Sequence, residues 1–96
     1  MSNIVGFEIG CVSYGFYIMM VSNEHDYAYR YCNTIKSYLQ IDNDDFINNL
    51  KSYGGKLLQL FNDCVDDAVI FFLDKEKAKV FIKDYLELLL IAKKLS

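Results

Sequence analysis

Apolar positions in the first quarter of the chain predict a β-hairpin. Residues 4–21 are rich in β-branched and aromatic side chains, and small residues interrupt them at Ser13–Gly15. This composition favours two short strands joined by a tight turn. The second strand, over residues 16–21, is apolar on both faces, so we expect it to lie in the centre of the sheet or to offer one face to a partner.

Segments farther along carry apolar residues at the three-and-four spacing of helices. This spacing predicts helices over residues 24–40, 42–53, 56–66 and 74–95. The run AVIFFL at residues 68–73 is short and wholly apolar, which is typical of a strand covered on both faces. Gly54-Gly55 is the expected end of the second helix, because glycine readily takes the left-handed conformation there.

The last predicted helix has more apolar residues than one buried face needs. At a regular helical period its inner face holds these residues: Ala78, Phe81, Ile82, Tyr85, Leu88, Leu89 and Ala92. Leu86 and Leu90 then widen the face beyond what the packing of two layers requires. The same helix carries lysines interrupted by acids, a spacing typical of a self-paired, solvated face: Lys75, Lys77, Lys79 and Lys83.

The order of these elements, β-β-α-α-α-β-α, predicts the α+β class. We expect a two-layer architecture in which an N-terminal β-hairpin and a third strand pack against about four helices. The chain has 96 residues, of which 53% are apolar, and this length and composition suit one core. We therefore expect residues 1–96 to form a single compact domain.

Charge, cysteine spacing and hydropathy argue against several classes of protein. The net charge is −3, and direct nucleic-acid binding is not expected because phosphate neutralisation needs clustered basic residues. The three cysteines stand at long spacings that fit neither a disulfide framework nor a zinc site. The apolar runs are shorter than the ~20 residues of a membrane span, and the N-terminus lacks a secretory signal pattern. We expect a cytoplasmic protein without a membrane partner.

No residue pattern indicates catalysis, a metal site or a cofactor. The only histidine, His25, lies between Glu24 and Asp26 in the first turn of an expected helix. Side chains adjacent in sequence point in different directions on a helix, and no nucleophile elbow accompanies them. The DNDD run at residues 42–45 lacks the glycine and the terminal glutamate of a calcium loop. We therefore do not expect an enzyme.

An acidic segment over residues 41–67 is the candidate partner-binding surface. It holds six aspartates in two groups and one candidate aromatic anchor: Asp42, Asp44 and Asp45; Asp63, Asp66 and Asp67; and Tyr53. Helix initiation largely explains the first group. The second group would end the following helix, where acids oppose the helix dipole, so these residues favour a binding role. The alternative is that both groups are solvated helix faces.

These features favour a small acidic protein that binds another protein. We expect an inhibitor or immunity type of antagonist that occludes a partner's basic surface. Arg30 is the only arginine, whereas Asn, Ile, Lys and Tyr are frequent, which favours an AT-rich genome such as that of a phage or another mobile element. The alternative is a homo-oligomeric small-ligand binder, with a homodimer interface on the hairpin or the terminal helix and tyrosines in a pocket.

Overall fold

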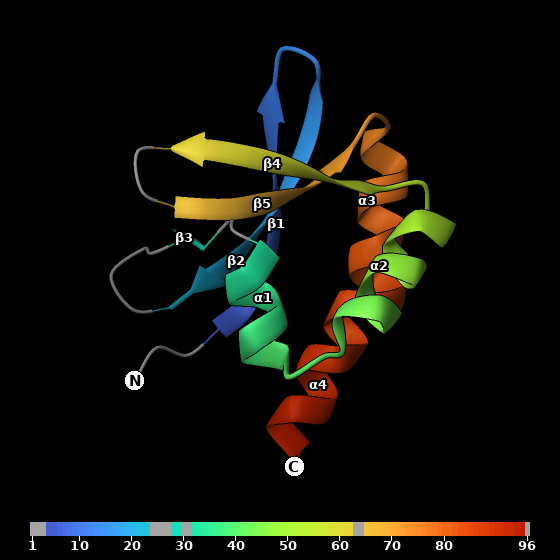
Figure 1. Ribbon diagram of the computed structural model, residues 1–96. Coiled ribbons are helices and arrows are strands. Elements are labelled where there is room, and N and C mark those ends of the chain that lie inside the picture. The colour runs from blue at the N-terminus through green and yellow to red at the C-terminus, as the bar shows by residue number, and fades with distance from the viewer. Residues whose placement is uncertain (1–3, 24–27, 30–31, 63–64, 96) are drawn as a thin grey trace.

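An antiparallel sheet and the helices packed on it form the fold (Figure 1). The computed structural model describes residues 4–23, 28–29, 32–62 and 65–95, and it describes side chains outside 28–29, 60–62 and 65–67. The strands are β1 (Ile4–Val12), β2 (Gly15–Ser22), β3 (Ala28–Tyr29), β4 (Lys56–Asn62) and β5 (Val65–Phe72). The helical elements are α1 (Cys32–Leu39), α2 (Asn43–Ser52), α3 (Lys75–Phe81), the π turn η1 (Ile82–Leu86) and α4 (Glu87–Leu95).

Two hairpins meet in the sheet, whose strand order is β1-β2-β5-β4, with β3 paired to β2. The β1–β2 hairpin has the predicted position, and β2 lies between β1 and β5 as its two apolar faces indicated. In the described residues, the strands of the two hairpins pair only where Phe16 and Tyr17 lie opposite Phe72 and Phe71. They diverge from this point, and in Figure 1 they cross at a steep angle. Among the described strands, β1, β3 and β4 each pair with one neighbour and therefore form edges of the sheet.

Strand β5 is covered on both faces, as its uniformly apolar sequence predicts. Ala68, Ile70 and Phe72 belong to the core cluster between the sheet and the helices. The opposite face is also covered, because Phe71 is buried. The Tyr14 ring lies 5.6 Å from the Phe71 ring centroid, and Lys56 Nζ lies 5.5 Å from it. On this face, the aliphatic part of the Lys56 side chain and the Tyr14 ring thus cover Phe71 without a second layer of helices.

The predicted helix over residues 24–40 is wrong in its first half. Residues 28–29 form β3, whose Tyr29 and Ala28 pair with Met20 and Val21 of β2. Residues 24–27 and 30–31, including His25, lie outside the described part of the chain. The helical pattern is correct from Cys32 onward, where α1 begins. A neighbouring strand thus supplies backbone partners that the local spacing of apolar residues does not reveal.

The predicted helix over residues 56–66 is also wrong, because residues Lys56–Asn62 form strand β4. This strand pairs with β5 in a register that runs from Lys56 opposite Phe71 to Asn62 opposite Val65. Leucine has a high helix propensity. In a short extended run, however, every second side chain faces the same side, so leucines can also form the apolar face of a strand. Pairing with the strongly β-favouring β5 decides the conformation.

Helix α2 begins and ends as the sequence predicts. Gly54 has a φ angle of 88° and so takes the left-handed conformation that stops the helix. The N–H groups of Gly54 and Gly55 donate to the carbonyl groups of Lys51 and Leu50 at 3.0 and 2.9 Å. These are the two hydrogen bonds of a Schellman motif, and they direct the chain into β4.

The terminal helix contains one extra residue that turns its second half. In η1 the Glu87 N–H donates to the Ile82 carbonyl group, five residues back, instead of four. One extra residue rotates the following turns by about 100° relative to a regular α-helix. Leu86 and Leu90 are therefore buried, whereas Leu88 is exposed. The predicted inner face, which included Leu88 and left Leu86 and Leu90 at its margin, is wrong beyond η1.

The coarse α+β class is confirmed, and the finer architecture is corrected. The strand order and the helix count both differ from the expectation, because the segment predicted as the third helix is a strand and β3 is an additional one. In the described residues, no helix combines the length and the apolar character that crossing a membrane requires.

Candidate protein-binding surface

The first aspartate group lies at the start of α2, as predicted. Asp42 is the N-cap residue, and its Oδ1 accepts a hydrogen bond of 2.9 Å from the Asp44 N–H. Asp44 and Asp45 follow in the first turn, where a negative charge is favoured by the helix dipole. Both side chains are exposed. Asp42 therefore has a structural role, while Asp44 and Asp45 remain available to a partner.

The second aspartate group does not lie at the end of a helix. Asp66 and Asp67 belong to β5, where they pair with Phe61 and Leu60 of β4. Asp63 lies outside the described residues. The argument that these acids oppose a helix dipole is therefore wrong, since the segment is a β-hairpin. In Figure 1 the start of β5 and the start of α2 lie far apart, so the structure does not join the two groups into one acidic surface.

Tyr53, the predicted aromatic anchor, packs within the protein. It is the C-cap residue of α2, ten residues after Asn43, with which that helix begins. Its ring centroid lies 5.4 Å from that of Phe81 in an edge arrangement. The side chain is half-buried. This ring therefore fixes α2 against the terminal helix, and the structure does not bring it to the aspartates at the other end of α2.

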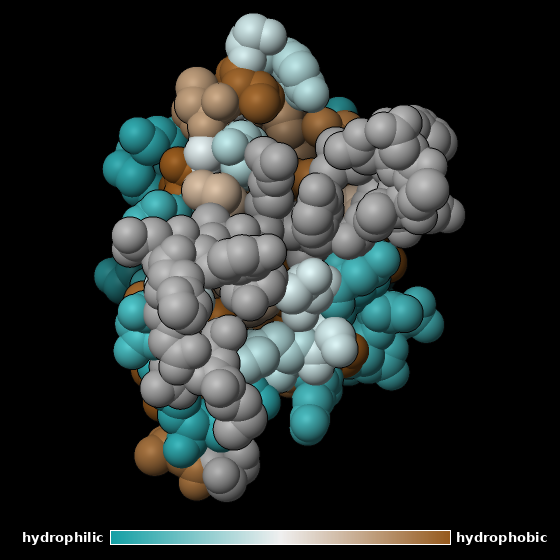
Figure 2. Space-filling model, turned by 90° about the vertical axis from the view of Figure 1, so that its left-hand side faces the viewer, coloured by the Kyte–Doolittle hydropathy of each residue, from teal (hydrophilic) through white to brown (hydrophobic). Residues whose placement is uncertain are grey.

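An exposed apolar surface follows the outside of the terminal helix. We call it the outer stripe, and it consists of Val80, Asp84, Leu88, Ile91 and Leu95. Its apolar side chains are 45%, 59%, 53% and 82% exposed, in chain order. The spacing places all five on one side of the helix. Figure 2 shows hydrophobic surface at the lower end of the molecule, where α4 ends.

The first turn of α2 packs against the terminal helix near Tyr85. The Phe46 and Tyr85 rings have centroids 6.3 Å apart. Burial raises the pKa of Tyr85, and the nearby charge of Asp45 raises it further. Asp45 therefore lies close enough to the terminal helix to act on Tyr85, and Asp44 precedes it in the same turn of α2. Asp84 is a carboxylate within the outer stripe itself.

The electrostatic effect of Asp45 on Tyr85 predicts a pH dependence. The Asp45→Asn substitution should lower the pKa of Tyr85 toward the ordinary tyrosine value of 10.0, since one of the two causes that raise it is removed. In the native protein the unfolded chain loses this proton first, so the free energy of unfolding should fall as the pH rises above about 10. NMR titration of the labelled tyrosine rings measures the pKa. Asp44→Asn is the matched control and should have little effect on the pKa of Tyr85. An unchanged pKa of Tyr85 in Asp45→Asn contradicts the effect of Asp45 on this ring.

The remaining chemistry of the described residues does not indicate a metal or catalytic site. No group of three or more metal-ligating side chains occurs among them. The exposed thiol of Cys11 stands on the edge strand β1, and its Sγ donates to the carbonyl oxygen of Val12 at 3.6 Å. The outer stripe and the carboxylates near it are thus the feature that the fold itself does not explain.

The sequence predicts surplus apolar residues and a candidate interface on the terminal helix, but not which of its residues are exposed, and the reason is geometric. Leucine or isoleucine stands at five of the six positions from Leu86 to Ile91. Whichever side of this segment faces the core, apolar side chains are therefore buried, and the sequence does not show which side that is. A weak signal is present in the four-residue repeat of Ala78, Ile82, Leu86 and Leu90, which is longer than the regular helical period.

Comparison with known proteins gives no relative from which a function could be taken. The chain matches no protein-family model, no curated protein and no solved structure at the level of significance required.

Proposed function

We propose that this protein is a small, non-enzymatic binding protein of the inhibitor or immunity type, which acts by covering a surface of a partner protein. The outer stripe is the observation that carries the proposal. Contiguous apolar side chains on a monomer's surface, bordered by charge, are typical of protein interfaces. The four apolar side chains of the stripe keep about half or more of their area exposed in the fold, so a partner that covers them gains apolar burial without unfolding the domain.

The carboxylates around the stripe indicate the character of the partner. Asp84 interrupts the stripe, and Asp44 and Asp45 lie in the turn of α2 that packs near Tyr85 of the terminal helix. In the described residues no ion pair neutralises these three carboxylates. A partner with an apolar patch rimmed by lysines or arginines complements this surface in both hydropathy and charge. Such a partner agrees with the expected basic surface, but the contact moves from the predicted aspartates at residues 63–67 to the terminal helix.

Capture experiments with matched variants test this proposal. The tagged protein is incubated with lysate of its native cells, and the retained proteins are identified by mass spectrometry. The double variant Leu88→Asp/Ile91→Asp should weaken capture of the partner at least about thirtyfold, as loss of a central apolar contact does. Asp44→Lys/Asp45→Lys should weaken it by about tenfold at low salt and less at high salt.

A third variant separates the two candidate surfaces. Asp66→Lys/Asp67→Lys changes the same number of charges in β5, away from the outer stripe, and should retain the partner. Loss of capture in this variant alone contradicts the proposal and returns the function to the β4–β5 hairpin. Sedimentation of the purified protein tests the alternative function. A homodimer that Leu88→Asp/Ile91→Asp converts to a monomer, with no captured partner, replaces the proposal by self-association.

A further inference from the structure

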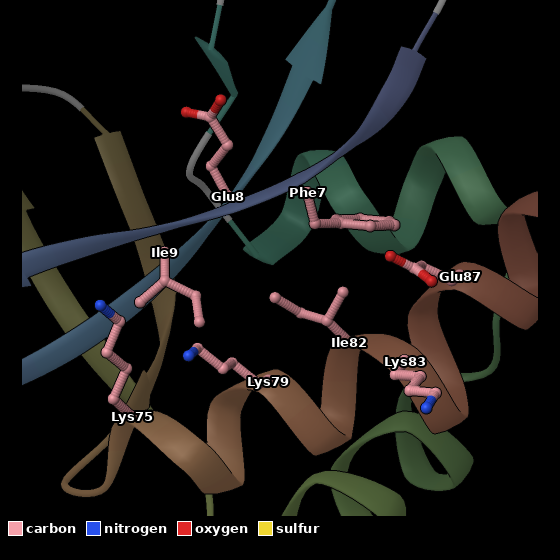
Figure 3. A pocket seen from close by; sticks show the side chains of 8 residues that line it. All are labelled: Phe7, Glu8, Ile9, Lys75, Lys79, Ile82, Lys83 and Glu87. Atoms are coloured by element: carbon pink, nitrogen blue, oxygen red, sulfur yellow. The ribbon is translucent and has the colours of Figure 1, made fainter.

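A second open surface lies between the terminal helix and strand β1. It is a groove of about 450 Å³, and we call it the edge groove. Its apolar floor consists of Phe7 and Ile9 of β1 and Ile82 of η1. Figure 3 shows these three side chains converging between the strand and the helix. None of the outer-stripe residues lines this groove, so the two surfaces use different side chains.

The backbone of β1 is open along the groove. A two-residue turn joins β1 to β2, so Val12 and Gly15, which close it, form a hydrogen-bonded pair. Such pairs alternate along an antiparallel ladder, so Phe7, Ile9 and Cys11 direct their N–H and C=O groups away from β2. In the described part of the chain no strand pairs with that side of β1. These groups are therefore ready to pair with an added strand.

Lysines line the helix side of the edge groove. The ammonium groups of Lys75 and Lys79 lie near Ile9 in Figure 3, whereas that of Lys83 points away from the floor. Lys79 Nζ forms an exposed ion pair of 3.2 Å with Glu76. A surface pair of this kind contributes at most about 1 kcal/mol, so a ligand carboxylate competes with it. One end of the groove is thus positive.

The acidic side chains of the edge groove lie away from Lys75 and Lys79. Glu87 points toward Phe7 at the opposite end, and Glu8 points to the other side of β1 (Figure 3). The groove is therefore polarised along its length. A bound segment gains most when its acidic residues lie beside Ile9 and its apolar residues lie toward Phe7 and Ile82.

The spacing of the lysines fits a strand. Lys75 and Lys79 are four residues apart on the helix, which corresponds to about 6 Å along its axis. Side chains on one face of a strand repeat every ~6.8 Å. Two carboxylates at alternate positions of an added strand therefore match the two ammonium groups.

We propose that the edge groove binds an extended, acidic peptide segment of a partner protein, which adds as a strand to β1 and places two carboxylates against Lys75 and Lys79. Backbone hydrogen bonds to Phe7 and Ile9 supply affinity, and the lysines and the apolar floor select the side chains of the segment. This inference goes beyond the binding function proposed for the outer stripe and does not depend on it.

Fluorescence anisotropy with designed peptides tests the inference. The probe is a labelled peptide in which threonine alternates first with glutamate and then with valine, and its matched control has glutamine in place of glutamate. The glutamate peptide should bind at least about tenfold more tightly than the glutamine peptide at low salt. N-methylation of the backbone amides that face β1 should weaken binding by a similar factor, because methylation removes the donors of strand addition.

Charge variants locate the peptide on the protein. Lys75→Glu/Lys79→Glu should weaken binding of the glutamate peptide at least about tenfold. Lys36→Glu/Lys51→Glu, which makes the same change of charge in α1 and α2 and outside the groove lining, should leave it unchanged. Circular dichroism confirms that each variant is folded. The inference is overturned if the glutamate peptide does not bind, if the N-methylated peptide binds equally well, or if the lysine variants leave binding unchanged. It is also overturned if vesicles of phosphatidylglycerol bind through these lysines and the peptide does not.

Discussion

Replacing Leu86 with aspartate should unfold the domain, whereas the same substitution at Leu88 should leave it folded. The two leucines stand in successive turns of one terminal helix, but Leu86 is 0% exposed and Leu88 is 59% exposed. A carboxylate at position 86 is buried without a partner, which costs at least about 4 kcal/mol in addition to the lost apolar contacts. A domain of this size has roughly 5–14 kcal/mol of stability to lose.

Urea denaturation followed by circular dichroism measures both variants. Leu88→Asp should change the free energy of unfolding by no more than about 0.5 kcal/mol, as exposed positions do. A regular α-helix without the π turn predicts the opposite order of effects, with Leu88 buried. Greater destabilisation by Leu88→Asp than by Leu86→Asp therefore contradicts the rotation at η1 and, with it, the outer stripe.

Phe81→Ala should be the most destabilising of the large-to-small substitutions. The Phe81 ring is 0% exposed, and it lies where α2, β5 and the terminal helix meet. Its centroid is 5.2 to 6.2 Å from those of the following aromatic rings: Phe46, Tyr53, Phe72 and Tyr85. Removal of such a ring costs about 3–5 kcal/mol through lost burial and the cavity that remains.

The neighbouring residue provides the control for Phe81→Ala. Val80→Ala shortens an exposed side chain in the same helical turn, and alanine is the better helix former, so stability should change by about 0.5 kcal/mol or less. Thermal and urea unfolding of both variants give the comparison. A cost below about 1.5 kcal/mol for Phe81→Ala means that the ring does not hold the three elements together.

The elements that the sequence predicts correctly are those with local chemical signals. The β1–β2 hairpin has a tight turn at small residues, and α2 has an N-cap at Asp42 and a stop at Gly54. Each of these features is decided by contacts within a few residues of the chain, so it is visible without knowledge of the fold.

The elements that the sequence predicts incorrectly depend on distant partners. Strand β4 has the composition of a helix, and only its pairing with β5 makes it extended. Strand β3 depends in the same way on β2. The side of the terminal helix that is buried beyond Ile82 depends on one π turn, which no residue type in that segment specifies.

The candidate site was predicted only in part for the same reasons. Asp44 and Asp45 were identified as candidates, and their exposure on α2 keeps them in the proposed surface. Leu88 was expected in the core, although it lies at the centre of the outer stripe. Asp66 and Asp67 gained their predicted role from a helix that does not form, so that role now rests on charge alone.

Site-specific photo-crosslinking tests the central claim, that the outer stripe binds a partner protein, most directly. Benzoylphenylalanine replaces Leu88 in one sample and Leu73 in another. Leu73 is 73% exposed, but it lies before α3 and outside the stripe. After irradiation in the native cells, the sample labelled at position 88 should form a covalent adduct with a protein that has a basic surface, and the sample labelled at position 73 should not. An adduct at position 73 with none at position 88 contradicts the claim.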